Sequence, residues 1–254
     1  MKIAVVTGAS SGMGEQFVRF IDRDELFDEI WVIARRKERL ESIFTDCRAK
    51  IRAIPLDLTR PESIDAYASL LKAENPEVSV LVNASGFGHF GAFADFPAEP
   101  QLEMIDLNCR ALTAITWQTI PYLVRGSRVY QVDSLSSFQP VPYICVYGAT
   151  KAYVLSFSRA LNVELRGRGI RVMAVCPGWV KTDFFDRAVT DNTITYYNRF
   201  YTAEQVVTRA LKDMKRGRDV SICGFPVRAQ VFATKLLPHK LIMKIWCNQQ
   251  KIKY

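Results

Sequence analysis

Metal ligands, paired thiols and long apolar runs are all scarce in this sequence of 254 residues. It has two histidines, and its six cysteines include no CxxC pair. We therefore expect no metal site, and free thiols of the kind found in a reducing cytoplasm. No apolar stretch approaches the ~20 residues of a membrane span. The short apolar run at 3–6 does not resemble a signal peptide, so a cytoplasmic location is expected.

Negative charge is missing from the end of the chain. The last carboxylate is that of Asp219, and six lysines and arginines follow it. The net charge is +8, so the remainder of the chain is nearly neutral. Because the basicity belongs to the tail, we expect no nucleic-acid partner.

Strand and helix patterns alternate along most of the chain. Hydrophobic residues make up 49% and charged residues 24%, which is typical of a globular protein. The alternation predicts an α/β fold with a parallel, doubly wound sheet and helices on both faces. Strands are expected at 2–6, 29–34, 51–56, 78–82 and 220–223, and a helix capped by Thr202 and Gln205 is expected to end near Lys215.

A glycine-rich turn joins the first strand to a helix. Its sequence is Thr7-Gly8-Ala9-Ser10-Ser11-Gly12-Met13-Gly14. Glycines let the backbone approach a pyrophosphate, and a helix N-terminus presents free N–H groups to it. The turn therefore predicts a dinucleotide cradle, with a simple tight turn as the alternative.

The residues after the second and third strands bear on the choice of cofactor. Arg35 and Arg36 stand where a fold that prefers NAD places Asp or Glu. A guanidinium suits a 2′-phosphate, so NADP(H) is favoured and NAD(H) is the second candidate. The alternative is a solvated basic start to the next helix. Asp57, followed by Leu58, either caps a helix or faces the adenine.

Tyr147 and Lys151 are four residues apart and share one face of a predicted helix. An ammonium at ~4 Å in a medium of effective dielectric ~20 favours a phenolate by ~4 kcal/mol. That is roughly three pKa units, which would bring the phenol near working pH. The alternative for this pair alone is an ordinary aromatic–lysine contact on a surface helix.

Six motifs in order make the chain resemble the short-chain dehydrogenase/reductase family over residues 1 to about 223. Thr7-Gly8…Gly12…Gly14 fits the family's T-G-x-x-x-G-x-G motif, and the Asn83-to-Gly86 stretch fits N-N-A-G. The other matches are Asn108, Ser134, the Tyr147–Lys151 pair, and Pro177-Gly178-Trp179-Val180-Lys181-Thr182. The resemblance implies a single Rossmann-like domain of about seven strands, at 1–224, and leaves a helical C-terminal extension at 225–254.

The resemblance also implies a mechanism of hydride transfer between a nicotinamide and an alcohol or ketone. Tyr147 is the expected general acid or base, and Ser134 stabilises the same oxygen. Lys151 would lower the tyrosine pKa and hold the ribose, while Asn108 would position a water. The residues expected around the cofactor are Gly8, Ser10, Ser11, Gly12, Met13, Gly14, Arg35, Arg36, Asp57, Leu58, Asn83, Ala84, Ser85, Gly86, Tyr147, Lys151, Pro177, Gly178, Val180 and Thr182.

Aromatic residues gather after the fourth, fifth and sixth strands, where a substrate would meet the nicotinamide. This favours a hydrophobic alcohol or ketone such as a steroid, fatty or aromatic carbonyl, although any single aromatic is more often core. The residues expected at the substrate are Phe87, Ser134, Tyr143, Trp179 and Phe184. The resemblance further implies a homodimer or homotetramer through helices near 105–124 and 147–166.

The sequence departs from the family pattern at two positions. Ala84 replaces an asparagine, which puts local rigidity in doubt, and Asp133 replaces a serine and adds a carboxylate that could shift the pH optimum.

Two other classes of function are compatible with a fold of this kind. A non-catalytic nucleotide sensor or scaffold is the main alternative, but Ser134, Tyr147 and Lys151 are all retained. A nucleotide-sugar epimerase or dehydratase would need a longer substrate domain.

The tail has the pattern of a basic amphipathic helix. Leu241, Ile242, Ile245, Trp246 and Ile252 fall on one face, and Lys240, Lys244 and Lys251 fall opposite. Peripheral contact with a membrane, contact with another subunit and packing on its own domain all fit this pattern.

Overall fold

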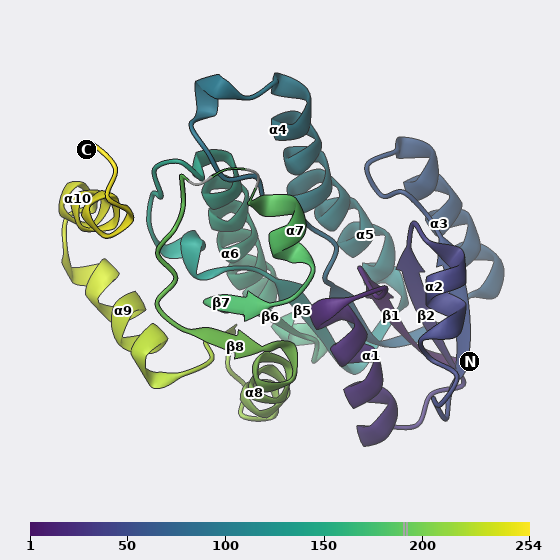
Figure 1. Ribbon diagram of the computed structural model, residues 1–254. Helices are drawn as coiled ribbons and strands as arrows, with labels where there is room; N and C mark the ends of the chain where they lie inside the picture. The colour runs from purple at the N-terminus through teal and green to yellow at the C-terminus, as the bar shows by residue number, and fades with distance from the viewer. Residues whose placement is uncertain (190, 192) are drawn as a thin grey trace.

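A parallel sheet forms the centre of the molecule. The computed structural model describes residues 1–189, 191 and 193–254. Within them seven strands run parallel in the order β3-β2-β1-β4-β5-β6-β9, which confirms the predicted doubly wound fold (Figure 1). The strands are β1 (Lys2–Thr7), β2 (Glu29–Ala34), β3 (Lys50–Pro55), β4 (Glu77–Asn83), β5 (Leu123–Val132), β6 (Arg171–Val175) and β9 (Val220–Ser221).

Alternate side chains of the strands build two cores, one on each face of the sheet. In β1, Ala4 and Val6 pack in the core that includes residues of α1 and α8. Ile3 and Val5 pack in the core that includes residues of α3, α5 and α6. Burial on both faces explains why the strands are nearly continuous apolar runs. The helices are α1 (Gly12–Asp24), α2 (Lys37–Ser42), α3 (Pro61–Glu74), α4 (Ala98–Ile105), α5 (Leu112–Thr119), α6 (Cys145–Leu165), α7 (Phe184–Ala188) and α8 (Ala203–Lys215).

Short elements complete the fold at the carboxyl edge of the sheet. A π-helical turn, η2 (Asp106–Ala111), joins α4 to α5, and β7 (Trp179–Lys181) pairs in parallel with β8 (Phe200–Thr202). Thr202 accepts a hydrogen bond from the backbone of Gln205 and the reciprocal bond is present, so the capping box predicted for α8 is confirmed. The 3₁₀ turns are η1 (Phe93–Asp95), η3 (Ile120–Tyr122), η4 (Leu135–Phe138) and η5 (Arg166–Arg168).

The C-terminal extension forms two helices, α9 (Phe225–Leu236) and α10 (His239–Gln250). The indole Nε1 of Trp246 donates to the carbonyl of Pro142 at 3.0 Å, so α10 packs back on its own domain. The tail therefore lies beside the rest of the molecule and not apart from it (Figure 1). Among the described residues, no helix has the length and apolarity needed to cross a bilayer.

The apolar face predicted for the tail is partly buried and partly exposed in the structure. Ile242 is buried and Trp246 is half-buried, whereas Leu241 and Ile245 remain more than two-fifths exposed. The helix ends at Gln250, so Ile252 lies beyond it. The helix therefore packs on the domain through only part of the apolar face identified in the sequence.

Candidate active site

Two cavities meet at the carboxyl ends of the central strands. The first, of about 290 Å³, lies against the glycine turn, and the second, of about 370 Å³, lies against α6 and the C-terminal helices. The residues that line both are Met13, Ala84, Gly86, Thr182 and Phe184. A molecule that spans the junction could place one end on the glycine turn and the other beside Tyr147.

The glycine turn leaves no room for side chains. Gly8 has a φ of +65°, and a Cβ there would lie 2.6 Å from the backbone of Ala84. A Cβ at Gly14 would overlap the carbonyl oxygen of Gly8. The hydroxyl of Thr7 accepts hydrogen bonds from the backbone N–H groups of Ala84 and Ser85, which ties β1 to the loop after β4. The bare backbone and the N-terminus of α1 fit the predicted pyrophosphate cradle.

The far end of the first cavity is basic. Arg35 and Arg36 both line it, and neither has an ion-pair partner among the residues that the structure describes, whereas nearby Lys37 and Arg39 are paired. Burial alone would raise the pKa of Asp57, but hydrogen bonds from Thr59 and the charge of Arg35 outweigh it and lower that pKa. Two free guanidinium groups beside a nucleotide-sized cavity fit a ribose 2′-phosphate.

The predicted cofactor residues divide between the two cavities, with one exception. Pro177, Gly178 and Val180 line the second cavity together with Tyr147 and Lys151. Asn83 lines neither, because its amide donates to the side chains of Thr116 in α5 and Gln131 in β5, both at 2.9 Å. The others line the first cavity: Gly8, Ser10, Ser11, Gly12, Met13, Gly14, Arg35, Arg36, Asp57, Leu58, Ala84, Ser85, Gly86 and Thr182.

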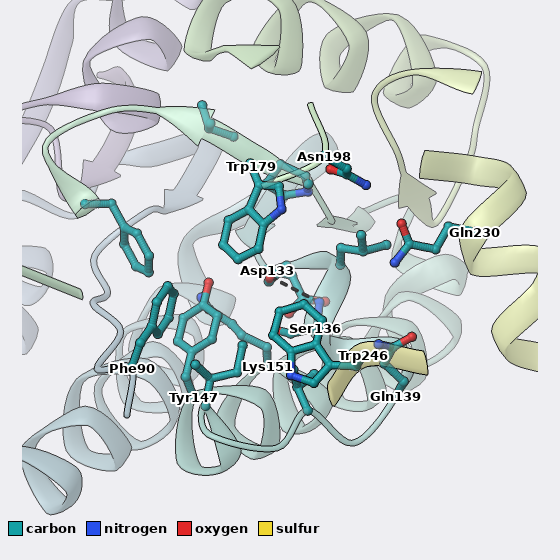
Figure 2. A pocket seen from close by; sticks show the side chains of 18 of the residues that line it. Phe90, Asp133, Ser136, Gln139, Tyr147, Lys151, Trp179, Asn198, Gln230 and Trp246 are labelled. Carbon is teal, nitrogen blue, oxygen red and sulfur yellow. Dashed lines mark hydrogen bonds between the residues drawn. The ribbon is translucent and has the colours of Figure 1, made fainter. Parts of the chain in front are cut away.

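Ser134, Tyr147 and Lys151 come together on the wall of the second cavity. Ser134 follows the end of β5, and its hydroxyl accepts from the backbone N–H of Ser136 at 3.2 Å. Tyr147 and Lys151 project from α6, and both are more than nine-tenths buried. Figure 2 shows their side chains next to one another at the cavity wall. The spacing on the helix therefore places them as the sequence predicted.

The expected lowering of the tyrosine pKa is not found. Burial raises the pKa of Tyr147; a hydrogen bond with Ser134 offsets part of this, and the charge of Asp133 adds to it. The ammonium of Lys151 donates to the carbonyl of Val132 at 2.9 Å and lies 5.7 Å from the centre of the phenol ring. The prediction assumed a closer ammonium and neglected desolvation, which disfavours a phenolate in this apolar setting.

Asp133 adds a buried negative charge to the site. Its side chain is 2% exposed, lines the second cavity and accepts a hydrogen bond from the thiol of Cys176 at 3.3 Å, while its Oδ1 has no partner among the described residues. Burial raises the pKa of Asp133 to about 7, although the charge of Lys151 opposes the rise. Burial lowers the pKa of Lys151, and Asp133 opposes that change. Each charge thus partly stabilises the other.

Asn108 fixes the backbone beside these groups. It lies in the π-helical turn, and its amide donates to the carbonyl of Phe87 at 2.9 Å and to the hydroxyl of Thr150 at 3.1 Å. Its carbonyl oxygen accepts from the N–H of Phe87. A Cβ on Gly86 would lie 2.9 Å from Asn108 Oδ1 and 3.7 Å from Lys151 Nζ, so both side chains lie next to that glycine.

Aromatic and aliphatic side chains form most of the second cavity. Trp179 and Phe184 line it as predicted, together with Phe90. Phe87 lines the first cavity instead, and Tyr143 lines neither, since it packs in the adjoining apolar cluster. The substrate role predicted for these last two residues is therefore not supported by their positions.

The substrate residues predicted from the sequence did not include several residues of the tail that line the second cavity. Ile242, Ile245 and Trp246 all line the second cavity, and so does Leu237. The amphipathic pattern with a tryptophan on the apolar face was the available signal. This pattern indicates that one face of the helix is buried, but it does not indicate which part of the protein that face contacts.

Comparisons with known proteins agree with this geometry. The family model described as short chain dehydrogenase matches residues 2–193. An uncharacterized oxidoreductase of Staphylococcus epidermidis is 30% identical over 183 residues, which cover 71% of this chain and 79% of that protein.

Solved structures are similar over nearly the whole chain. A short-chain dehydrogenase from Sphingobium yanoikuyae in complex with NADPH has 30% identity and a TM-score of 0.81, with 95% of each chain covered. The bulky-bulky ketone specific alcohol dehydrogenase from Comamonas testosteroni has 26% identity and a TM-score of 0.74, with 95% of this chain and 94% of that chain covered.

Proposed function

The chain belongs to the short-chain dehydrogenase family of oxidoreductases, and we propose that it reduces a hydrophobic ketone to a secondary alcohol with NADPH. The observation that carries this proposal is the position of Tyr147 beside Ser134, in a cavity that adjoins the glycine cradle. In this proposal the proton donor Tyr147 and the oxyanion stabiliser Ser134 lie next to the nucleotide site.

The residues of the chain have separate tasks in this reaction. The bound nicotinamide cofactor supplies the hydride. Tyr147 donates a proton to the carbonyl oxygen, and its raised pKa keeps it protonated at neutral pH, which favours ketone reduction. Ser134 donates a hydrogen bond to the same oxygen as negative charge develops there. Lys151 supplies positive charge next to the phenol and is held in place by Val132.

NADP(H) is the preferred cofactor in this proposal, with NAD(H) as the weaker one. The glycine turn would hold the pyrophosphate, and Arg35 and Arg36 would bind the 2′-phosphate, because both guanidinium groups line the cavity without an ion-pair partner in the described part of the chain. The Sphingobium relative is in complex with NADPH, which supports the same choice.

The substrate in this proposal is a large apolar ketone. Phe90, Trp179 and Trp246 give the second cavity apolar walls, and its volume of about 370 Å³ lies within the usual range for ligand pockets. The similar Comamonas enzyme is specific for bulky-bulky ketones, which supports a bulky substrate here.

We also propose that the chain acts as a homo-oligomer located in the cytoplasm. Trp117 on α5 and Tyr153 and Val163 on α6 are large and exposed, on the helices through which the family resemblance implies subunit contacts. Sedimentation equilibrium of the full chain tests this, and a monomer at all concentrations would contradict it.

Peripheral membrane contact through the tail is a further part of the proposal. The C-terminal surface, defined as the outward faces of α9 and α10, exposes four large apolar residues next to four cations. These residues are Phe225, Phe232, Leu236 and Leu241, with Arg228, Lys235, Lys240 and Lys244. An apolar face with adjoining cations suits an anionic bilayer surface.

Replacing Tyr147 by Phe tests the catalytic assignment. We expect NADPH binding to be unchanged, because the phenol hydroxyl donates to the substrate, and turnover to fall by roughly a hundred- to ten-thousandfold. NADPH fluorescence measures binding, and ketone-dependent NADPH oxidation measures turnover. Tyr153→Phe, on the exposed face of the same helix, is the matched control and should keep full activity. Near-normal turnover in Tyr147→Phe would remove Tyr147 from the mechanism.

A further inference from the structure

The second cavity has its charged side chains at one end and also contains several neutral carboxamide side chains. Asp133 and Lys151 are the charged side chains that line it among the described residues, and both belong to the reacting end. Four carboxamide side chains also line the cavity, from Gln139, Asn198, Gln230 and Gln249.

The carboxamides lie away from the reacting groups. Figure 2 shows Gln139 and Gln230 on the side of the cavity opposite Phe90 and Tyr147, and it shows Trp246 between Tyr147 and Gln139. Gln139 follows the turn after Ser134, and Gln230 comes from α9, so the C-terminal extension contributes to this end. The cavity thus has a reacting end, an apolar middle and an amide-bearing far end.

The amides of Gln139 and Gln230 are available to a ligand. Both side chains are half-buried, and neither forms a hydrogen bond with another described residue. A carboxamide carries two N–H donors and a carbonyl acceptor. By contrast, Asn198 accepts a hydrogen bond from the backbone of Arg199 at 2.7 Å, and Gln249 is exposed at the rim.

We propose that Gln139 and Gln230 form a subsite for a neutral hydrogen-bonding group, a hydroxyl or carbonyl, at the distal end of an elongated apolar ketone. This rests on the proposed ketone reduction and narrows its substrate class. An amide pair both donates and accepts, so it matches either group. Among the described residues, no cation lines this end of the cavity, so a distal carboxylate would lose hydration there without gaining an ion pair, and the subsite selects against it.

The expected discrimination is modest but measurable. A neutral hydrogen bond changes an equilibrium by roughly five- to tenfold, because each partner also exchanges a bond with water. When a bound ketone lacks the distal group, the half-buried amides can form hydrogen bonds only with water at the rim. Such a ketone should therefore bind roughly five- to tenfold less tightly than one that carries the group.

Three probe ketones with one apolar body test the subsite: acetylbiphenyl, its derivative with a hydroxyl on the distal ring, and its derivative with a carboxyl there. Trp179 and Trp246 line the cavity, so quenching of tryptophan fluorescence reports binding to the enzyme–NADP⁺ complex. We expect the hydroxyl derivative to bind roughly fivefold more tightly than acetylbiphenyl, and the carboxyl derivative to bind less tightly than either.

The double variant Gln139→Met/Gln230→Met keeps the length of both side chains and removes their polar groups. We expect it to bind the hydroxyl derivative no more tightly than acetylbiphenyl, while its affinity for acetylbiphenyl is maintained. Gln118→Met is the matched control, because Gln118 is half-buried and lines neither cavity. Absence of the hydroxyl preference in the wild-type protein, or its survival in the double variant, would overturn the subsite.

The two proposals fail in different ways. If ketone reduction is wrong, none of the three probes is turned over, yet the affinity comparison still tests the amide pair. If only the subsite is wrong, all three ketones are reduced through Tyr147 without the expected order of affinities.

Discussion

Asp133 and Lys151 are buried near Tyr147, the proposed proton donor, and the charge of each shifts the pKa of the other. Asp133 raises the pKa of Tyr147 and of Lys151. The serine that the family usually has at this position would carry no charge. The negative charge of Asp133 therefore acts on the pKa of Tyr147, the proposed proton donor, and this effect should be visible in the pH dependence of the reaction.

Replacing Asp133 by Asn removes that negative charge. The pKa values of Tyr147 and Lys151 should then fall, so both groups lose their protons at lower pH. We expect the alkaline limb of kcat/KM for ketone reduction to move to lower pH. In the wild-type protein, titration of Asp133 with a pKa of about 7 should add an inflection near neutrality that the variant lacks.

Steady-state rates across the pH range measure both effects. Cys176→Ala is the control, because it removes the thiol that donates to Asp133 but keeps the carboxylate. Its profile should retain the neutral inflection. Identical profiles for the wild-type protein and Asp133→Asn would show that the carboxylate does not act on the reaction.

Arg35 and Arg36 are the residues that we propose determine the choice between NADPH and NADH. Replacing either by Gln removes a charge-assisted hydrogen-bond donor, so kcat/KM for NADPH should fall roughly ten- to hundredfold while that for NADH stays nearly constant. Arg39→Gln serves as control, because Arg39 contacts Asp183 and does not line the nucleotide cavity. An equal loss with both cofactors would exclude a 2′-phosphate site at these arginines.

At the scale of elements, α10 holds the loop that follows β7 and α7. The buried Gln250 side chain accepts from the backbone N–H groups of Thr195 and Tyr196 at 3.0 and 2.9 Å and donates to the carbonyl of Tyr196 at 3.1 Å. Tyr196 lines the second cavity, where we propose that the substrate binds. One side chain therefore links the last helix to the wall of the site.

Gln250→Leu would leave these backbone groups without partners. We expect a loss of about 2 kcal/mol of unfolding free energy and a severalfold higher KM for bulky ketones. Thr202→Ala removes the cap of α8, away from the cavity, and should cost about 1 kcal/mol without changing KM. Thermal unfolding and steady-state kinetics separate the two effects. An unchanged KM in Gln250→Leu would mean that the loop does not depend on α10.

At the scale of the whole molecule, positive charge and exposed apolar area coincide on the C-terminal surface. Phe225 is 75% exposed, Phe232 65% and Leu236 68%, along one side of α9. Carboxylates are absent from the chain after Asp219, so nothing within the tail neutralises its cations. This surface adjoins the cavity, since Leu237 and Ile245 are both exposed and line it.

Phe232→Ser/Leu236→Ser should reduce binding to anionic vesicles, because it removes apolar area that enters the bilayer interface. Co-sedimentation with phosphatidylglycerol-containing and pure phosphatidylcholine vesicles measures it, and the wild-type protein should prefer the anionic ones. Val163→Ser, an exposed apolar residue on α6, is the matched control. Absence of wild-type binding to either vesicle would eliminate membrane contact.

Local sequence patterns were sufficient to predict the fold of the protein and the residues proposed to react. The glycine turn, the capping box at Thr202 and the spacing of Tyr147 and Lys151 are short-range features, because each depends on residues within a few positions of one another. The parallel direction of the strands also followed from alternation, since parallel strands require crossover helices, whereas their order in the sheet was not predicted. Fold and family were therefore predictable from the sequence.

The sequence by itself determined which chemical groups the protein has and the local geometry in which they are presented. Only the tertiary structure decided how those groups behave, because burial and contacts between distant residues are not contained in local spacing. Folding buries Tyr147 and raises its pKa where the helix spacing predicted a lowered one. It also brings Trp246 to Pro142, across about a hundred positions of sequence, and so makes the tail part of the wall of the second cavity.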